Sequence, residues 1–349
     1  MSDFSQTLLN WFRENGRDLP WRQTRDPYAI WLSEIILQQT QVKQGWDYWE
    51  RFMHRWPTVE ALAAATEDEV LREWQGLGYY SRARNLHYAA RQVVALGYFP
   101  NTIESIRQLK GVGDYTAAAI GSIAFGLPAA VVDGNVYRVL ARHFGIDTPI
   151  NTSEGKKLFQ SLAQSLLPSS ERFDQSPSSF LLPPSSEYNQ AIMDFGAIQC
   201  TPQSPHCMEC PLMDSCVALR EGRVGELPVK KKTLKVRERH LVYIYIRCKG
   251  EVAIHRRGAG DIWQGLWEPW LTDEIPPAAI LLQQHVKHVL THRILLADFY
   301  LLDTDERPLL PEDYIWIPEV DIDNYGVPRL VERLLSLVPR DGDSYPHDH

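Results

Sequence analysis

The sequence predicts a multidomain chain in which an all-α domain is followed by an α+β domain. The chain has 349 residues, more than one ordinary domain needs. Up to about residue 165, apolar residues recur at spacings of three and four, which is the period of a helix. Beyond residue 240 they occur in β-rich runs. With 44% hydrophobic and 23% charged residues, the composition is that of a globular protein.

The predicted all-α domain covers residues 1–220, and short loops with Gly or Pro separate its helices. The apolar period predicts helices within residues 8–12, 30–52, 59–74 and 83–96, and the helical pattern returns at 188–199. We expect no strand before residue 240. Residues 168–186 are rich in Ser and Pro, which predicts an irregular surface loop between two helices.

A linker over residues 221–239 leads into the α+β domain, which covers residues 240–338. Strands are predicted over 240–248, 251–257, 292–302 and 313–318, and Lys249-Gly250 forms the turn of a hairpin between the first two. The apolar spacing over 327–338 predicts a closing helix. The remaining residues, 339–349, are expected to be a disordered tail.

The formal net charge of −8 is unevenly distributed. Residues 301–349 contain 12 Asp and Glu against 4 Lys and Arg, so the first 300 residues are neutral overall. Within them, the segment KKKTLKVRER at 230–239 has six positive charges and one negative charge, a net of +5. A local patch, not the total charge, sets the field that a polyanion meets. The patch fits a nucleic-acid partner, and a solvated linker would have the same composition.

The N-terminus lacks the basic start and apolar stretch of a signal peptide. No apolar run approaches the length of about 18 residues that a membrane span requires. We therefore expect a soluble, intracellular (cytoplasmic) protein with no membrane partner. We also expect it to be a monomer. The five cysteines of such a chain need an explanation other than disulfides.

Four cysteines predict a metal cluster at the end of the all-α domain. Cys200, Cys207, Cys210 and Cys216 follow the spacing C-x6-C-x2-C-x5-C. Structural zinc commonly uses two C-x2-C pairs, whereas this run has one pair and uneven gaps that suit a loop around a [4Fe-4S] cluster. We favour the [4Fe-4S] cofactor with a structural role; zinc and a redox role stay open. The fifth cysteine, Cys248, lies in a predicted strand and fits a buried apolar position.

A Gly-rich turn predicts a phosphate-binding hairpin. Gly111, Val112 and Gly113 join two helical segments, and the second helix starts at about Asp114. Such a turn can point its N–H groups at an anion beside the positive end of a helix dipole. This is the helix-hairpin-helix arrangement, which binds DNA phosphates without reading sequence. An ordinary turn between two helices is the alternative.

The motifs resemble MutY-type adenine DNA glycosylases, of the helix-hairpin-helix superfamily that includes endonuclease III. They are LPWR, SEIILQQTQV, GLGYYSRARNLH, LKGVGDYTAAAI, VVDGNVYRVLAR, YNQAIMDFGA and the four-cysteine spacing, which together run from residue 19 to 216. More loosely, DIWQGLWEPW and KHVLTHRIL resemble the family's MutT-like, or Nudix-like, C-terminal domain. The resemblance implies a bacterial-type enzyme, active at the nucleoid, that removes adenine mispaired with 8-oxoguanine or guanine in double-stranded DNA.

The resemblance also implies roles for residues around the adenine. Glu34 matches the general acid, Asp133 the carboxylate that stabilises the sugar cation, and Asn135 a residue that assists near the sugar. Tyr115 stands where bifunctional relatives carry a Schiff-base Lys, and because Tyr cannot form an imine, little or no lyase activity is expected. Four residues match the adenine pocket: Trp21, Arg22, Leu37 and Gln190.

Further residues match contacts to the rest of the DNA. The wedge that enters the duplex is matched by Leu77, Gly78 and Tyr79, and contacts to the opposite strand by Gln39 and Thr40. In the C-terminal domain, Leu290, Thr291 and His292 stand in place of a Phe-Ser-His loop that reads 8-oxoguanine. Here Thr keeps the hydroxyl of Ser, and Leu lacks the stacking face of Phe.

The residues around the two acids suit this chemistry. Adenine leaves more easily once protonated, so one carboxyl must be kept protonated and another ionised. Glu34 lies among apolar helix neighbours, which raise a carboxyl pKa, whereas Asp133 stands at a helix start with polar neighbours and should remain ionised. We expect one helix to present both Glu34 and the residues that follow it and contact the opposite strand, Gln39 and Thr40.

Three other functions stay open. An endonuclease III-type enzyme would share the hairpin, Asp133 and the cluster, but Tyr115 and the second domain argue against it. A Nudix pyrophosphatase needs a REx2EExG-type array of Mg²⁺ ligands, which the sequence after Trp270 lacks. A mismatch binder without enzymatic activity would not need the pair of Glu34 and Asp133.

Overall fold

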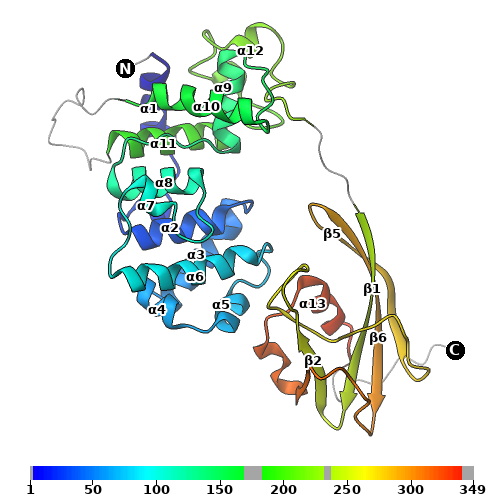
Figure 1. Ribbon diagram of the computed structural model, residues 1–349. Helices are drawn as coiled ribbons and strands as arrows, with labels where there is room; N and C mark the ends of the chain where they lie inside the picture. Colours follow the sequence, from blue (N-terminus) through cyan, green and yellow to red (C-terminus); the bar gives the residue numbers. More distant parts are fainter. Residues whose placement is uncertain (1–2, 169–182, 232–236, 340–349) are drawn as a thin grey trace. The chain divides into compact units, whose positions relative to one another are not determined.

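The computed structural model describes residues 3–168, 183–231 and 237–339 and divides into two compact units (Figure 1). The first unit comprises Met1–Glu60 and Tyr88–Lys232, and the second comprises Ala61–His87 and Thr233–His349. A helical part and a part with a β-sheet confirm the predicted fold class. The predicted domain boundaries at residues 220 and 240 stay a prediction. Most of the Ser- and Pro-rich loop, the centre of the basic linker and nearly all of the tail lie outside the described residues.

Helices make up the first unit. They are α1 (Asp3–Asn15), η1 (Pro20–Arg22), α2 (Pro27–Leu37), α3 (Val42–Arg55), α7 (Ile103–Ile106), α8 (Asp114–Phe125), α9 (Gly134–Phe144), α10 (Ser153–Leu166), α11 (Pro184–Asp194), the π-helical η3 (Phe195–Gln199), η4 (Cys207–Glu209) and α12 (Val217–Arg220). Two others, α4 (Val59–Ala64) and α6 (Ser81–Leu96), cross the division between the units, and α5 (Glu67–Glu73) lies in the second.

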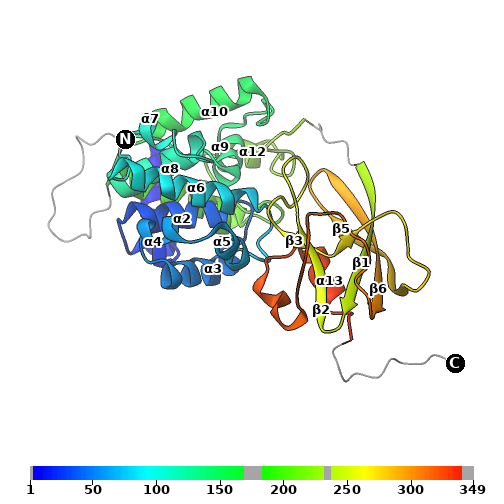
Figure 2. The ribbon, with the colours of Figure 1, turned by 60° about the horizontal axis from the view of Figure 1, so that its bottom comes forward.

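Local sequence explains where the helices that carry the candidate site begin and end. Asp26 caps α2 by accepting a hydrogen bond from the Tyr28 N–H, and Pro27 fills the first helical position. Gly126 ends α8 in the left-handed conformation, which glycine adopts without strain. Helix α8 packs against α2 (Figure 2) and α11, and its residues 116–123 are all buried, which explains its almost uninterrupted apolar sequence.

The second unit contains a mixed sheet in the order β3-β2-β1-β6-β5, with β4 paired to β1 and β7 to β2. The strands are β1 (Arg237–Cys248), β2 (Glu251–Arg256), β3 (Trp267–Glu268), β4 (Trp270–Leu271), β5 (Ile280–Val289), β6 (Arg293–Thr304) and β7 (Tyr314–Pro318). The central pair, β1 and β6, is parallel, and the other pairs are antiparallel. The hairpin at Lys249-Gly250 is confirmed, with both residues at positive φ.

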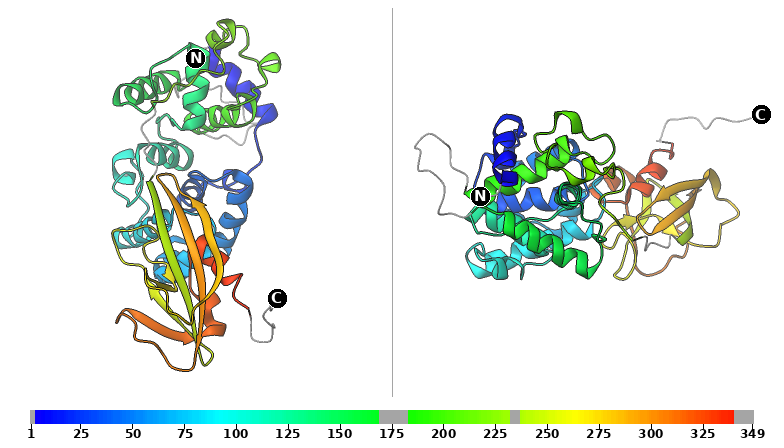
Figure 3. Two further views of the ribbon diagram at one scale, coloured as in Figure 1. Left: turned by 90° about the vertical axis from the view of Figure 1, so that its right-hand side faces the viewer. Right: turned by 90° about the horizontal axis from the view of Figure 1, so that it is seen from above.

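Helix α13 (Arg329–Leu335) lies against one face of this sheet (Figure 3). Its buried Leu330, Val331 and Leu334 share a core with Tyr243 and Phe299 of the two central strands. Because β1 and β6 are covered on both faces, they are apolar along most of their length. None of the helices in the described ranges is long and apolar enough to span a membrane.

Candidate active site

A cavity of about 940 Å³ in the first unit brings together most of the predicted site. It is lined by all the residues predicted for catalysis and for the base pocket, together with two predicted DNA contacts: Glu34, Tyr115, Asp133, Asn135, Trp21, Arg22, Leu37, Gln190, Gln39 and Thr40. These residues come from five separate segments of the chain. A shared cavity is what a site for one extrahelical base and its sugar requires.

Glu34 lies at the wall of this cavity and is 9% exposed. Burial raises the pKa of its carboxyl to about 7, in the direction that its apolar helix neighbours predict. The Tyr115 hydroxyl donates a hydrogen bond of 2.8 Å to Glu34 Oε2 and partly counteracts this shift. Sequence reasoning gave Tyr115 no such partner, because the two residues are 81 positions apart. The hydrogen bond fixes the orientation of a carboxyl that titrates close to neutral pH.

Asp133 caps α9 and faces the same cavity, so it combines the two roles that its sequence position allows. Its Oδ1 accepts hydrogen bonds from the N–H groups of Asn135, at 2.9 Å, and Val136, at 2.8 Å. The Asn135 side chain donates to Asp133 Oδ2 at 2.8 Å. Burial raises the pKa of Asp133, whereas these hydrogen bonds and the nearby Arg138 favour the ionised form. The pKa of Asp133 is therefore raised overall, although its polar neighbours in the sequence predict an ionised group, because burial is the larger effect.

Sequence reasoning missed two residues here: Arg17, which lines the cavity, and Asp194, which binds two of the lining arginines. Asp194 is fully buried and accepts hydrogen bonds from the guanidinium groups of Arg17 and Arg22, the shortest at 2.5 and 2.7 Å, and from the Arg17 N–H at 2.9 Å. Although burial opposes ionisation, the donors on Arg22 and Arg17 hold the pKa of Asp194 below its usual range. Both arginines line the cavity. The acid inside the matching segment YNQAIMDFGA was the available signal.

The pocket residues differ in how tightly they are held. Trp21 is buried and packs edge-on against Trp46 and Trp49, so its ring has a fixed place. Gln190 is 2% exposed, and its Nε2 donates to Ser186 Oγ at 3.0 Å. Its Oε1 is buried and has no hydrogen-bond partner among the described residues. A buried acceptor without a partner at a cavity wall is suited to receive a donor from a ligand.

The prediction that one helix presents both Glu34 and the opposite-strand contacts Gln39 and Thr40 is wrong. Helix α2 ends at Leu37, and Gln39 has a left-handed φ of +58°. Gln39 and Thr40 therefore lie in the turn between α2 and α3. The turn holds its own shape through the Thr40 N–H, which donates to the Leu37 carbonyl at 3.2 Å. A left-handed non-glycine residue ends a helix and re-aims the side chains that follow.

The predicted phosphate-binding hairpin also lies in the first unit. Gly111 has a φ of +79°, and Gly113 is the N-cap of α8 without a side-chain cap. Both glycines are exposed, whereas Val112 between them is buried. The exposed helix start leaves backbone N–H groups for an anion. Its role in binding DNA stays a prediction.

A second cavity, of about 990 Å³, lies in the second unit and contains the remaining predicted DNA contacts. The wedge residues Leu77, Gly78 and Tyr79 and the reader residues Leu290, Thr291 and His292 all line it. The Tyr79 hydroxyl is 2.5 Å from the Thr291 Oγ1, so two segments more than 200 residues apart meet there. Three arginines and one aspartate also line this cavity: Arg84, Arg293, Arg329 and Asp261. The surplus of positive charge suits an anionic ligand.

The four predicted cluster ligands line one small cavity next to α9, and none of them forms a disulfide. Arg142 donates to Cys200 Sγ at 3.4 Å and to the carbonyls of Thr201, at 2.7 Å, and Pro202, at 3.0 Å. Arg138, on the same helix, donates to the Cys200 carbonyl at 2.7 Å and to Asn135 Oδ1 at 2.9 Å. The four cysteines around this cavity would supply the four thiolate ligands that a [4Fe-4S] cluster needs. The loop is thus attached to the helix that Asp133 caps.

Replacing Cys210 by Ser is expected to remove the cluster and to destabilise the first unit, because the loop loses one of four ligands. Iron content and the visible absorbance of the purified protein measure the first effect, and thermal unfolding the second. Cys248→Ala is the matched control, since Cys248 is a buried free thiol in β1. Equal iron content in the Cys210→Ser variant and wild type would contradict the assignment of Cys210 as a ligand.

Comparisons with known families agree with this geometry. The family model described as "HhH-GPD superfamily base excision DNA repair protein" matches residues 32–165. The model "Iron-sulfur binding domain of endonuclease III" matches residues 200–216, and the model "NUDIX domain" matches residues 242–337. The loop match and its donor set establish an iron–sulfur site of the [4Fe-4S] type.

Several curated relatives carry the name adenine DNA glycosylase. The chain is 43% identical to the one from Rattus norvegicus over 239 residues, which are 64% of this chain and 44% of that protein. It is 33% identical over 268 residues to the one from Buchnera aphidicola subsp. Schizaphis graminum, covering 76% of this chain and 73% of that protein. The chain thus spans less than half the length of the rat protein.

Among solved structures, a thermostable thymine-DNA glycosylase is similar at 32% identity with a TM-score of 0.55, covering 62% of this chain and 95% of that one. A trapped endonuclease III–DNA covalent intermediate is similar at 22% identity with a TM-score of 0.51, covering 62% and 94%. The second likeness concerns the fold alone.

Proposed function

Because the chain belongs to the adenine DNA glycosylase family, we propose that it removes adenine from double-stranded DNA by hydrolysing the N-glycosidic bond. We further propose that the adenine is mispaired with 8-oxoguanine or guanine, and that the enzyme has little or no lyase activity. The observation that carries the proposal is that two carboxyl groups line one cavity. Glu34 accepts a hydrogen bond from Tyr115, and Asp133 accepts hydrogen bonds from three donors.

The two carboxyl groups divide the chemistry. Glu34, whose pKa is raised to about 7, carries a proton that it can give to adenine N7, so that the base leaves as a neutral molecule. As the bond between the sugar C1′ and the base nitrogen breaks, positive charge develops on the sugar. Asp133 stabilises that charge, and Asn135 and the two backbone donors keep its carboxylate in place. Water then adds to C1′ and loses a proton.

The selection of adenine is supported by the polar groups around the pocket. The unpaired, buried Gln190 Oε1 can accept a hydrogen bond from an exocyclic amino group, which adenine has and thymine lacks. The guanidinium groups of Arg17 and Arg22, fixed by Asp194, present donors to ring nitrogens. The rings of Trp21 and the side chain of Leu37 supply apolar contact.

Recognition of the opposite strand is supported by the second cavity. There the wedge around Tyr79 meets the predicted reader loop, whose Thr291 and His292 offer polar groups to a base edge. The exposed glycines of the hairpin would bind the phosphate backbone. We further propose that the chain acts as a monomer in the cytoplasm, which analytical ultracentrifugation and cell fractionation would test.

A substrate panel tests the proposal. Single-turnover cleavage is measured on duplexes with A:8-oxoguanine, A:G, A:C, thymine glycol and G:T, each with and without alkali. Strand breaks on the adenine mispairs that appear only after alkali are expected, because Tyr115 cannot form the imine that cuts the strand. Cleavage of thymine glycol with efficient borohydride trapping would favour an endonuclease III-type enzyme. Cleavage of G:T alone would favour the activity named for the thymine-DNA glycosylase to which the chain is similar.

A further inference from the structure

The second cavity contains an aromatic side chain that the predicted reader loop lacks. At position 290 the loop has Leu where the resemblance implies Phe, so the loop lacks the phenyl ring that would stack there. Trp263, in the turn between β2 and β3, lines the same cavity as Leu290, Thr291 and His292. We propose that Trp263 is a specificity-determining residue whose ring stacks on the base opposite the excised adenine. The inference rests on the proposed recognition of an A:8-oxoguanine mispair.

The backbone of Trp263 is held in an uncommon conformation. Its φ is +62°, in the left-handed region, where a bulky residue is strained. The other described non-glycine residues with positive φ are Gln39, Tyr79, Lys249 and His285. Lys249 forms the β1–β2 hairpin, and His285 lies at an irregularity in the pairing of β5. Gln39 and Tyr79 are predicted DNA contacts, so Trp263 shares its left-handed backbone with two residues that are predicted to contact DNA.

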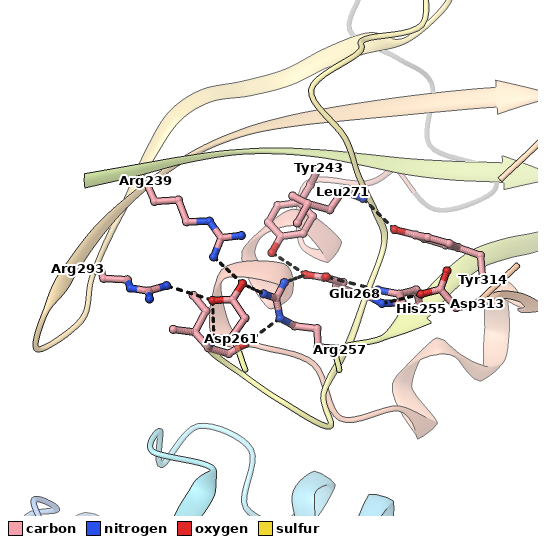
Figure 4. A network of polar contacts seen from close by, with 11 residues as sticks. Arg239, Tyr243, His255, Arg257, Asp261, Glu268, Leu271, Arg293, Asp313 and Tyr314 are labelled. Carbon is pink, nitrogen blue, oxygen red and sulfur yellow. Dashed lines mark hydrogen bonds and ion pairs between the residues drawn. The ribbon is translucent and has the colours of Figure 1, made fainter. Parts of the chain in front are cut away.

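A partly buried ion network braces the turn that carries Trp263 (Figure 4). Arg257, with a side chain only 5% exposed, donates to the Ile262 carbonyl at 2.8 Å and to Asp261 Oδ2 at 2.7 Å, and it pairs with Glu268. Asp261 Oδ1 in turn accepts the Ile262 N–H at 2.7 Å. Buried charges are costly unless paired, and here the pairs fix the backbone immediately before Trp263. Such a brace keeps the ring in one place before any ligand arrives.

Two further arginines attach the turn to the central strands. Figure 4 shows Arg239 and Arg293, at the starts of β1 and β6, directed toward Asp261. Their distances to the Asp261 carboxylate are 2.5 and 3.1 Å. The Glu268 carboxylate also accepts the Tyr243 hydroxyl of β1 at 2.8 Å. The turn that carries Trp263 is therefore attached to the two central strands of the sheet.

The surroundings of the ring fit a nucleotide. The Arg257 guanidinium lies 5.8 Å from the centre of the Trp263 ring, and the His288 ring lies 5.8 Å away at an angle of 61°. Arg293 and Arg329 line the same cavity and can meet phosphate. An aromatic face beside cationic groups and the polar Thr291 is the combination that binds an unstacked base. Stacking would hold that base against the polar groups of the loop, which read its edge.

The experiment measures the affinity for two duplexes that carry a non-cleavable 2′-fluoro-adenosine opposite either 8-oxoguanine or guanine. Trp263→Leu is expected to weaken binding to the 8-oxoguanine duplex about tenfold or more, and binding to the guanine duplex about threefold or less. Trp263→Phe should retain most of the wild-type preference. The double variant Trp263→Leu/Leu290→Phe should recover at least part of it, because a ring returns to the same cavity.

Trp316→Leu is the matched control. Trp316, in β7, is also partly buried and also has an arginine over its ring, Arg307 at 5.1 Å, but it does not line the cavity. Its variant should keep the wild-type preference, and thermal unfolding of every variant checks that each is folded.

The outcomes separate this inference from the function on which it rests. A wild type that binds both duplexes equally would contradict the proposed recognition of 8-oxoguanine. A wild type with a clear preference, retained in a folded Trp263→Leu variant, would overturn the role of Trp263. If Tyr79→Leu lost the preference for the 8-oxoguanine duplex and Trp263→Leu kept it, the stacking ring would be that of Tyr79 in the wedge and not that of Trp263.

Discussion

Replacing Glu34 by Gln is expected to lower the single-turnover rate of adenine excision by about 10²–10⁴, the usual contribution of a general acid. Gln has the shape of Glu, and its oxygen can still accept the Tyr115 hydroxyl, so the cavity should keep its form. Gln has no proton to give to adenine. The wild-type rate should fall about tenfold per pH unit above pH 7, where Glu34 loses its proton, and the residual rate of the variant should lack this alkaline limb.

The same substitution is expected to stabilise the protein at alkaline pH. Folding raises the Glu34 pKa from 4.5 to about 7, so between these values the folded state binds a proton that the unfolded state has lost. The free energy of unfolding of the wild type therefore falls as pH rises through this window, and above it the cost is about 3 kcal/mol. Gln does not titrate. The variant should thus gain about 3 kcal/mol over the wild type at pH 8 and less than about 1 kcal/mol at pH 5.

Urea unfolding of both proteins at pH 5 and pH 8 measures this difference. A substitution that removes activity and adds stability in the same pH range is the mark of a group kept buried for its chemistry. Loss of activity with equal or lower stability at pH 8 would show that the Glu34 pKa is not raised by burial. An unchanged excision rate would remove Glu34 from the mechanism.

Much of this site could be predicted because its signals are local. The cysteine spacing, the Gly111–Gly113 turn and the acid before the Gly-Asn of α9 each lie within one short segment. An N-cap such as Asp133 accepts hydrogen bonds from N–H groups two and three residues ahead, so the residues next to it in the sequence are enough to predict the cap. The resemblance assigned the chemistry to these positions, and the cavity brings Asp133 and Glu34 together.

The contacts that could not be predicted are those between distant segments. The hydrogen bond from Tyr115 to Glu34 and the meeting of Tyr79 with Thr291 depend on how whole elements pack. The end of α2 depends on the left-handed φ of Gln39, which no composition rule reveals. Strand β5 was not predicted from the sequence. Its pairing with β6 has two register shifts, which break the alternation of apolar and polar residues that would indicate a strand.

Asp194 is the clearest case of a distant contact, and its replacement by Asn is expected to destabilise the first unit by about 3–5 kcal/mol. Its carboxylate is fully buried and binds Arg17 and Arg22, which are more than 170 residues away in the sequence. Asn removes the negative charge and leaves two guanidinium groups without their counter-ion. Because both arginines line the active cavity, adenine excision should fall as well.

A neighbouring ion pair on the same helix provides the matched control. Glu187 of α11 pairs with Arg13 at 3.0 Å, but the Arg13 side chain is 53% exposed, so Glu187→Gln should cost less than about 1 kcal/mol. Urea unfolding of both variants gives the comparison. A loss of less than 1 kcal/mol in Asp194→Asn would mean that Asp194 does not hold the two arginines in solution.

The pH dependence of stability gives an independent check on Asp194. The pKa of Asp194 in the folded state lies below the usual 3.8. Its contribution to the free energy of unfolding is therefore fully present above that value and is lost as pH falls through the folded-state pKa. Wild-type stability should therefore drop below about pH 4, and the part of that drop due to Asp194 should be missing from Asp194→Asn. The effect of Glu34 on stability has the opposite sign, because burial of its carboxyl lowers the free energy of unfolding more as pH rises. One buried acid thus stabilises the fold at neutral pH while the other is kept, at a cost in stability, for the reaction.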